Sequence, residues 1–483
     1  MKFDLSNHRG VLIMPMLVST SLAVPPTSLS YLGAVLKEHN VQYKIIDMRL
    51  GYSVINITTI IQVYKPTFVG ISCWSIGRSI INNLIESIKE ITYVPVVLGG
   101  AHVSSVRSQC LEENNADYAI KGEGEFVLIE LLQYLNGNIP KLNSIRGLLY
   151  RANGKIIENS DREPIDDLDS LPFPAYEDCE RDRYREKRVL MTTSRGCPYG
   201  CNYCAVKLIM GRSFRTRSPG NVIDEFIHWY ELGYRIFDIA DDCFTFDLKR
   251  SEEICDLIIK NNLEIVINLD TGIRADRVNE SLLIKLKQAG CKTIMFGVES
   301  GDNRVLKTIG KNLKIEQAEK AVHLAKKVGI QRVGATFIIG HPGETLNTFK
   351  RYLSKIKKWP LDKVSFYMLV PYPGTKLFDW VERNSFLFDE VEKYLDTHTI
   401  TSDCPVFETK EYPRGDRVKA FKLGKKMSDR LHTRNMNKLY IKKYGFIIGF
   451  IAGKLITHNK YLLFLPLRIN KFLKTVSNEY ENI

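Results

Sequence analysis

Apolar runs alternate with amphipathic stretches along the first 150 residues of the chain. Residues 29–39 carry apolar side chains at helical spacing. The neighbouring runs are apolar throughout and predict strands at residues 11–17, 43–48, 68–73 and 94–100. Fully apolar strands separated by helices are typical of a parallel sheet that is covered on both faces. We therefore predict a doubly wound α/β domain over residues 1–150, with a ligand site beyond the carboxyl ends of its strands.

A second strand–helix series follows a stretch rich in Asp, Pro and Glu at residues 151–185. We interpret this stretch as a linker because Pro164, Pro172 and Pro174 interrupt any continuous helix. The strands predicted after it lie at residues 189–194, 235–241, 265–270, 293–299, 334–340 and 364–369, with amphipathic helices such as 316–328 between them. Six such units over residues 186–385 predict a barrel or a partial barrel, whose chemistry takes place in the loops after the strands.

The pattern becomes helical and basic over residues 386–483. The formal net charge of the chain is +13, yet residues 417–474 hold 15 Lys and Arg against the single acid Asp429, so the rest of the chain is nearly neutral. Charge confined to one region points to a partner rather than to the fold. Residues 444–469 are apolar but are interrupted by Lys454, His458, Asn459 and Lys460, and fall short of the roughly 20 uninterrupted residues that span a bilayer.

Three interpretations of this basic region stay open. It binds an anionic membrane surface, it forms a helical cap whose apolar face covers the barrel, or it binds RNA. RNA is disfavoured because no known single-strand-binding motif accompanies the charge.

Cysteine usage bears on the cellular compartment and on the chemistry. Ten cysteines in 483 residues are too dilute for a secreted disulfide scaffold, and the N-terminal residues lack the pattern of a signal peptide. We therefore expect a cytoplasmic protein with reduced thiols, with peripheral membrane contact if the basic region binds lipid. Reduced thiols favour metal binding or catalysis over cross-links.

Cys197, Cys201 and Cys204 stand on one loop directly after the first predicted barrel strand. Thiolates bind soft metals and iron–sulfur clusters. A structural zinc site takes four ligands, and this loop offers no fourth Cys or His, so zinc would need a remote ligand. Three ligands on a cubane cluster would instead leave one iron open to a substrate.

The segment GCPYGCNYC resembles the cluster motif of the radical S-adenosylmethionine (radical SAM) enzymes. Five later segments resemble that family in the same order: FDIADDCFTFD, TGIRADRV, FGVESGDNRVLKTIGK, GATFIIGHPGET and VPYPGTKLFD. The resemblance implies a partial (β/α)6 TIM-like barrel and a 4Fe–4S cluster held by Cys197, Cys201 and Cys204. It further implies that the open iron chelates SAM, that one electron cleaves SAM to a 5′-deoxyadenosyl radical, and that a flavodoxin- or ferredoxin-type donor supplies this electron.

The matching segments also provide the predicted SAM contacts. These are Asp241, Asp242, Arg274, Glu299, Ser300, Gly340 and Pro342. Carboxylates at a strand end accept bonds from an ammonium group, and an arginine pairs with a carboxylate through two parallel bonds. A glycine turn lets the backbone approach adenine closely.

The first domain resembles the Rossmann-like cobalamin-binding domain that precedes the barrel in one class of this family. The matching pieces are ISCWSIG, LGGAHVSS and DYAIKGEGE, and the predicted cobalamin contacts are Ser72, Ser75, Gly99, Gly100 and His102. The DxHxxG loop of such domains gives cobalt an axial histidine, but here the equivalent stretch is DMRLGY. Arg49 takes the place of that histidine and stays protonated, so it cannot bind cobalt. His102 is the nearest alternative ligand.

The leading hypothesis is a cobalamin-dependent radical SAM enzyme that methylates an unactivated carbon of a small, apolar substrate such as a lipid or a tetrapyrrole. Alternatives are cyclisation or C–C bond formation without methyl transfer, and a non-catalytic Fe–S or zinc scaffold. Sulfur insertion into tRNA is disfavoured because the first domain has only Cys73 and Cys110, and nucleic acid is not an expected partner. No residue stands out as a general acid or base.

Overall fold

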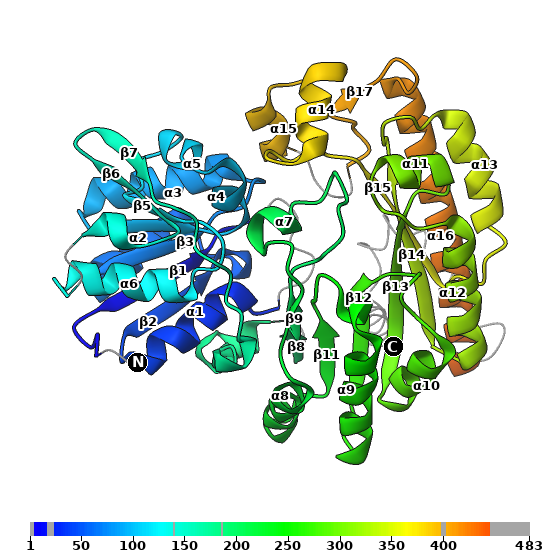
Figure 1. The fold of residues 1–483 in the computed structure, drawn as a ribbon, viewed down its shortest axis with the longest axis horizontal. Helices are drawn as coiled ribbons and strands as arrows, with labels where there is room; N and C mark the ends of the chain where they lie inside the picture. Colours follow the sequence, from blue (N-terminus) through cyan, green and yellow to red (C-terminus); the bar gives the residue numbers. More distant parts are fainter. Residues whose placement is uncertain (1–3, 17–23, 139–140, 185–186, 398–401, 445–483) are drawn as a thin grey trace, which may run out of the picture.

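The computed structural model describes residues 4–16, 24–138, 141–184, 187–397 and 402–444 (Figure 1). The apolar segment predicted at residues 444–469 therefore lies outside the described residues from residue 445 onward. Two large sheets organise the rest of the chain, and each has its own hydrophobic core.

The first sheet has seven strands in the order β2-β1-β3-β4-β5-β6-β7. Its strands are β1 (Arg9–Met14), β2 (Gln42–Asp47), β3 (Phe68–Ser72), β4 (Val96–Gly99), β5 (Tyr118–Ile120), β6 (Leu148–Ala152) and β7 (Lys155–Glu158). The first five are parallel, whereas β6 and β7 add antiparallel strands at one edge. The hairpin was not expected from the sequence, and it carries the sheet past residue 150, where the sequence analysis places the end of the first domain.

Helices cover both faces of this sheet, which confirms the doubly wound class. Leu12 of β1 packs in one core with α1 (Thr27–Glu38) and α6 (Glu125–Leu135), and its neighbour Ile13 packs in the other. That second core includes α2 (Val54–Tyr64), α3 (Arg78–Ile91), α4 (Ala101–Val106) and α5 (Gln109–Glu112). Alternate side chains of a strand point to opposite faces, so a strand buried on both sides is apolar throughout.

The second sheet has six parallel strands in the order β15-β14-β13-β12-β11-β8. These are β8 (Arg188–Met191), β11 (Ile236–Ile239), β12 (Val266–Ile273), β13 (Cys291–Glu299), β14 (Arg332–Ile339) and β15 (Lys363–Met368). The helices that alternate with them are α8 (Pro219–Glu231), α9 (Leu248–Lys260), α10 (Glu280–Gln288), α11 (Asn303–Thr308), α12 (Ile315–Val328) and α13 (Leu346–Ile356). Because β8 and β15 stand at the two edges, the barrel is partial, as the sequence predicts.

The helix α16 (Arg414–Tyr444) runs along β15 and α13 on the outside of the barrel (Figure 1). Phe421 and Met427 are buried against the barrel, and the Arg434 guanidinium donates to Leu361 O at 2.8 Å. Lys422 and Lys425 on the same helix are exposed. The described part of the basic region thus covers the barrel with its apolar face and keeps Lys422 and Lys425 in solvent, whereas Arg417 is buried. Among the described helices, none is both long and apolar enough to cross a membrane.

A small subdomain lies between β15 and α16 at the upper end of the barrel (Figure 1). It contains α14 (Lys376–Asn384), β16 (Phe386–Leu387), α15 (Val391–Thr397) and β17 (Phe407–Glu408), which share one hydrophobic cluster. This subdomain contacts the first domain, since the Ser79 amide donates to the Asp396 carboxylate at 3.0 Å.

Candidate functional site

The three cysteines lie on the loop after β8, and each is partly exposed. The loop is packed tightly at its start and between the first two cysteines. A Cβ added to Gly196, which has φ +85°, would lie 2.2 Å from Ser213 O. A Cβ added to Gly310, which has φ +73°, would lie 2.6 Å from Gly200 O. The fold therefore requires glycine at both positions.

The thiols differ in their surroundings. Contact with the Cys243 thiol lowers the pKa of Cys197 to about 7, whereas burial raises the pKa of Cys204 to about 11. In the described part of the chain, no three His, Cys, Asp or Glu side chains gather closely enough to hold a single metal ion. A cubane cluster takes each thiolate on a different iron, so its ligands lie around a larger group. Three partly exposed thiols on one rigid loop suit such a cluster.

Asp241 and Asp242 follow β11, and the structure separates their roles. The Asp241 carboxylate is 1% exposed and accepts from Thr193 N at 2.6 Å, Thr193 Oγ1 at 2.6 Å and Ser194 Oγ at 2.5 Å. It therefore holds the residues that lead into the cysteine loop. Asp242 is partly exposed and accepts one bond, from Gly196 N at 3.0 Å. Burial raises the pKa of this carboxyl group.

Arg274, predicted to pair with a carboxylate of SAM, already has protein partners. Its Nε donates to Asp276 at 3.0 Å, and its Nη2 donates to Lys311 O at 2.7 Å. The guanidinium carbon also lies 3.6 Å from the centre of the Tyr199 ring, which belongs to the cysteine loop. In this arrangement Arg274 supports the loop.

Glu299 ends β13 with φ +72°, a backbone conformation that is uncommon for residues other than glycine. Its carboxylate accepts from the Lys311 ammonium at 3.0 Å, and both side chains lie over Gly297. Ser300 is fully buried and accepts from Asp302 N at 3.3 Å. Lys311 closes one of the family segments in the sequence, but nothing in the sequence assigned it a role.

Gly340 and Pro342 form the turn after β14, and the structure adds two side chains there that sequence reasoning missed. His341 is fully buried, with its ring 5.3 Å from the ring of Tyr203 in the cysteine loop. Arg417 of α16 is also fully buried, and a Cβ at Gly340 would lie 2.5 Å from its Nη1. Among the described residues, neither ring nitrogen of His341 and neither Nη of Arg417 has a hydrogen-bond partner.

The buried His341 gives a testable pH dependence. Burial, with the nearby charges of Arg417 and Lys311, lowers its pKa to about 3 from an ordinary value of 6.5. The unfolded chain therefore takes up a proton below about pH 6.5 that the folded chain does not, and stability is lost as the pH falls. Relative to His341→Met, the wild type should lose about 2 kcal/mol of unfolding free energy between pH 6.5 and pH 5.

Urea unfolding at these two pH values measures the difference, with the exposed His323→Met as the control. An equal pH dependence in wild type and His341→Met would contradict the prediction.

The predicted cobalamin contacts lie at the carboxyl edge of the first sheet. Ser72 ends β3 and Gly99 ends β4. A Cβ added to Gly99 would meet no atom of the described residues within 4 Å. Gly100 has φ +111°, and a Cβ added to it would lie 3.0 Å from Cys73 O. Backbone without side chains at such an edge suits a flat ligand that packs against it.

His102, the candidate axial ligand, and Arg49, which stands in place of the usual histidine, both have protein partners in this structure. His102 is 1% exposed and bonds the Ser75 hydroxyl through Nδ1 and the Glu113 carboxylate through Nε2, both at 3.1 Å. Arg49 folds back on Asp47, with Nε at 2.8 Å and Nη2 at 2.6 Å from its carboxylate oxygens. The prediction of His102 as an alternative ligand therefore finds no support, because both ring nitrogens are engaged. The site fits cobalamin bound without an axial histidine.

The two candidate sites adjoin each other. The short helix α7 (Val206–Ile209) begins two residues after Cys204 and packs against α4, which begins directly after Gly100 (Figure 1). Gly374, beyond β15, also approaches α4 closely, since a Cβ there would lie 2.7 Å from Ser105 O. The fold thus joins the cysteine loop and the glycine-lined edge across the domain boundary.

Comparisons with known proteins agree with this arrangement. The chain matches the B12 binding domain over residues 15–132 and the Radical SAM superfamily over residues 191–356. It is 32% identical over 431 residues to an uncharacterized methyltransferase of Pyrococcus horikoshii, which covers 88% of this chain and 92% of that protein. It is 29% identical to the anaerobic magnesium-protoporphyrin IX monomethyl ester cyclase of Rubrivivax gelatinosus, over 77% of this chain and 68% of that protein.

The fold is similar to that of a solved radical SAM methyltransferase, TsrM from Kitasatospora setae, with cobalamin and a [4Fe-4S] cluster bound. The TM-score is 0.67 at 18% identity, over 78% of this chain and 75% of that one. The cofactors are a 4Fe–4S cluster, SAM and cobalamin. This follows from the order of the two domains and from the thiol-bearing loop after the first barrel strand. The chain belongs to the radical SAM superfamily, as an enzyme that carries a B12-binding domain before its radical SAM domain.

Proposed function

We propose that this enzyme methylates an unactivated carbon of a small, apolar substrate. The observation that carries the proposal is the junction of α7 and α4, which brings the cysteine loop next to the glycine-lined edge of the first sheet. Methylation also agrees with the relative from Pyrococcus horikoshii, which is described as a methyltransferase. When bound, the cluster with SAM supplies a radical that abstracts hydrogen, and cobalamin supplies the methyl group.

The residues of the chain bind and orient these groups. We propose that Cys197, Cys201 and Cys204 hold the cluster. We propose that the carboxylate of Asp242, which is partly exposed, accepts from the amino group of SAM. We also propose that the Lys311 ammonium, which lies beside Cys201 and is paired with Glu299, attracts the carboxylate of SAM. The buried nitrogens of His341 and the turn at Gly340 would face the adenine end, because His341 packs on Tyr203 of the same loop.

Ser72, Ser75, Gly99 and Gly100 would bind cobalamin through hydroxyls and backbone. His102 then acts indirectly, since its bond at 3.1 Å orients the Ser75 hydroxyl. This arrangement leaves the cobalt without a protein ligand from Arg49 or His102.

Cyclisation is the second candidate, and the 29% identity to the cyclase of Rubrivivax gelatinosus favours it. The two candidates share cofactors and differ in the fate of the methyl group of SAM. A methyltransferase places this group on the product, whereas a cyclase does not.

The test is anaerobic reconstitution with iron, sulfide and hydroxocobalamin, followed by metal analysis. About four irons per chain and one retained cobalt are expected. The loaded enzyme is then supplied with dithionite, methyl-labelled SAM and a tetrapyrrole or lipid extract. Label in an extracted product supports methylation. SAM cleavage that consumes a substrate without labelling it rejects methylation in favour of cyclisation.

We further propose that the basic C-terminal region contacts an anionic membrane surface. Lys422, Lys425, Lys426 and Arg430 line one exposed groove of α16, and more basic and apolar residues follow in the sequence. Each Lys or Arg near an anionic surface contributes about 1 kcal/mol.

Flotation with vesicles of phosphatidylglycerol and phosphatidylcholine measures this contact. The full chain should float at low salt and lose most of its binding at about 0.5 M salt, because screening shortens the reach of the charges. A chain truncated at Tyr440 should bind weakly. Equal flotation of the two proteins would exclude a membrane role for the removed residues.

A further inference from the structure

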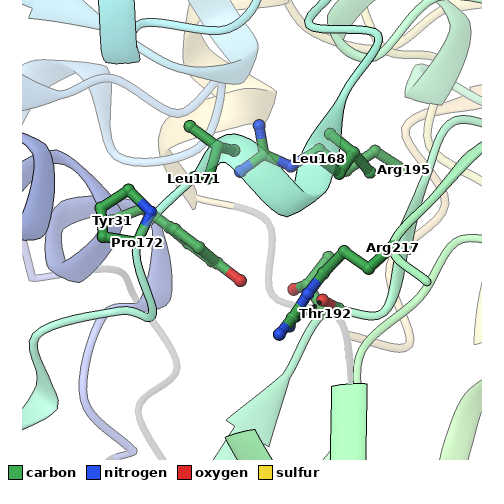
Figure 2. A pocket seen from close by; sticks show the side chains of 7 residues that line it. All are labelled: Tyr31, Leu168, Leu171, Pro172, Thr192, Arg195 and Arg217. Atoms are coloured by element: carbon green, nitrogen blue, oxygen red, sulfur yellow. Dashed lines mark hydrogen bonds between the residues drawn. The ribbon is translucent and has the colours of Figure 1, made fainter. Parts of the chain in front are cut away.

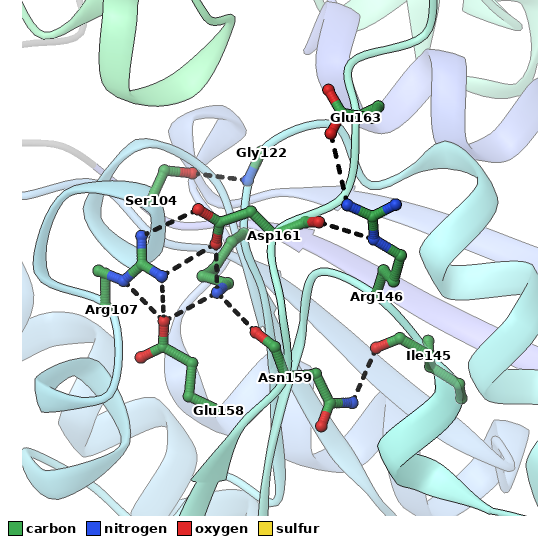
Figure 3. A network of polar contacts seen from close by, with 10 residues as sticks. Ser104, Arg107, Gly122, Ile145, Arg146, Glu158, Asn159, Asp161 and Glu163 are labelled. Atoms are coloured by element: carbon green, nitrogen blue, oxygen red, sulfur yellow. Dashed lines mark hydrogen bonds and ion pairs between the residues drawn. The ribbon is translucent and has the colours of Figure 1, made fainter.

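The loop after β5, residues 121–124, is fixed to the rest of the first domain by partly buried polar contacts (Figure 3). The Lys121 ammonium is 2.8 Å from the Glu158 carboxylate and 2.6 Å from that of Asp161. The Gly122 amide donates to Ser104 Oγ of α4 at 3.0 Å. The loop thus lies at the same carboxyl edge as Gly99 and Gly100 and is held on both sides.

Two carboxylates, one in this loop and one at the start of α6, reach the barrel. Glu123 pairs with Arg195 and with Arg215 at 2.8 Å, and Glu125 pairs with Arg195 at 2.7 Å. All four side chains are between 4% and 8% exposed. The Arg195 guanidinium also lies 5.1 Å from the ring centre of Tyr31 in α1, and both residues line the small cavity in Figure 2. Arg195 belongs to β9 (Ser194–Arg195), yet its guanidinium contacts Glu123, Glu125 and Tyr31 of the first domain.

Arg195 stands two residues before Cys197, in a run that is held residue by residue. Arg217 donates to Thr192 O at 3.1 Å, and Arg250 donates to Thr193 O at 2.6 Å. Asp241 accepts from Thr193 and Ser194. These three anchors come from the barrel itself. The backbone of Arg195 pairs with Arg215 of β10 (Arg215–Thr216), but its side chain differs because its partners, Glu123 and Glu125, come from the other domain.

Stability alone does not account for these pairs. Removing four charges from water is costly, and apolar replacements of buried ion pairs are often as stable as the pairs themselves. Buried charges do fix geometry, because a bidentate guanidinium accepts few orientations. The position of Arg195, between the β5 loop and Cys197, is therefore the property to explain.

We propose that Arg195 is a positioning residue through which Glu123 and Glu125 fix the cysteine loop relative to the cobalamin domain. Cobalamin bound at the carboxyl edge would further restrain the β5 loop, and the ion pairs would transmit this restraint to the loop that holds the cluster. The inference rests on the proposed assignment of that edge to cobalamin and of that loop to the cluster. Coupling of this kind is reciprocal, so an ordered cysteine loop also favours cobalamin binding.

Amide hydrogen exchange of the full chain tests the proposal without any activity measurement. In the wild type, hydroxocobalamin should slow exchange in residues 192–206 by about 10-fold, a size typical of coupling between sites. Glu125→Gln keeps the shape of the side chain but removes its charge, and should reduce this slowing to less than about 2-fold. Because coupling is reciprocal, the affinity of Glu125→Gln for hydroxocobalamin should be weaker than that of the wild type by no more than the factor by which the slowing of exchange is reduced.

Glu130→Gln is the matched control. Glu130 lies on the same helix as Glu125 and pairs with Arg162 at 2.9 Å, away from the cysteine loop. This variant should retain the full slowing. Arg195→Lys keeps the charge but loses the planar guanidinium, whose two Nη groups each meet one carboxylate, and it should give an intermediate value. If Glu125→Gln does not unfold cooperatively and is therefore misfolded, Arg195→Lys is the variant that tests the proposal.

The outcomes separate this inference from the proposed function. Full slowing of residues 192–206 in Glu125→Gln would overturn the inference, because direct contact with cobalamin would then protect the loop. If the wild type binds no hydroxocobalamin, the proposed function fails, and transmission between the sites fails with it. The positioning role is then decided in the protein without cofactor, where Glu125→Gln should exchange faster than Glu130→Gln in residues 192–206.

Discussion

Replacing Cys204 by alanine is expected to lower reductive SAM cleavage by more than about 100-fold and to release most of the iron after anaerobic reconstitution. The loss of a metal ligand exceeds the 10- to 100-fold effects that are typical of groups supporting a ligand. Cys204 is one of three thiols on a loop that offers no fourth Cys or His. Iron analysis, with quantification of 5′-deoxyadenosine under dithionite, measures both effects.

Cys243→Ala is the matched control for this prediction. Cys243 is fully buried and contacts Cys197, but it lies after β11, outside the triplet. The variant should keep its iron and its SAM cleavage, with a stability change in the range of an ordinary core truncation. If Cys243→Ala loses iron as Cys204→Ala does, four thiols hold the cluster. No iron is then open to SAM, and the non-catalytic scaffold becomes the better interpretation.

The first four strands of the first sheet and all six barrel strands were predictable because each contains a short, mostly apolar run, whereas β5, with three residues, was not predicted. Burial on both faces removes the need for polar positions, so β1, β3 and β4 and the six barrel strands are visible without any tertiary information. The hairpin of β6 and β7 was missed. β7 has the alternating exposure of an edge strand, and it lies inside the stretch of residues 151–185 that its Asp, Pro and Glu content marked as a linker.

The cysteine loop was predictable from local spacing, but its supports were not. A carboxylate at a strand end can bind a ligand or a neighbouring loop, and only the fold places the donors of Thr193 and Ser194 around Asp241. Arg274 is a similar case, because only the fold shows that its guanidinium donates to Asp276 and to Lys311 O. Arg417 gave no local signal because its partner, the turn at Gly340, lies far away in the sequence.

Asp241→Ala should lower the free energy of unfolding by about 3–5 kcal/mol, the usual cost of breaking a buried charged network. Asp241 is 1% exposed and accepts three bonds, so its removal leaves three buried donors without an acceptor. The cysteine loop would lose its attachment to β11, and the variant should also reconstitute poorly with iron. Urea unfolding of the protein without cofactors gives the stability change independently of the cluster.

Asp242→Ala should show the opposite pattern, although the two residues are neighbours in sequence. Asp242 is partly exposed and accepts a single bond, so its loss should cost no more than about 1 kcal/mol of stability. If its second oxygen binds the amino group of SAM, the Kd for SAM should rise about 10-fold or more, since a charge-assisted bond contributes about 1.5–3 kcal/mol. Equilibrium binding of SAM to the iron-loaded variant measures this change. An unchanged Kd would assign the amino group to another acceptor, and a large loss of stability would place Asp242 with Asp241 as a support of the loop.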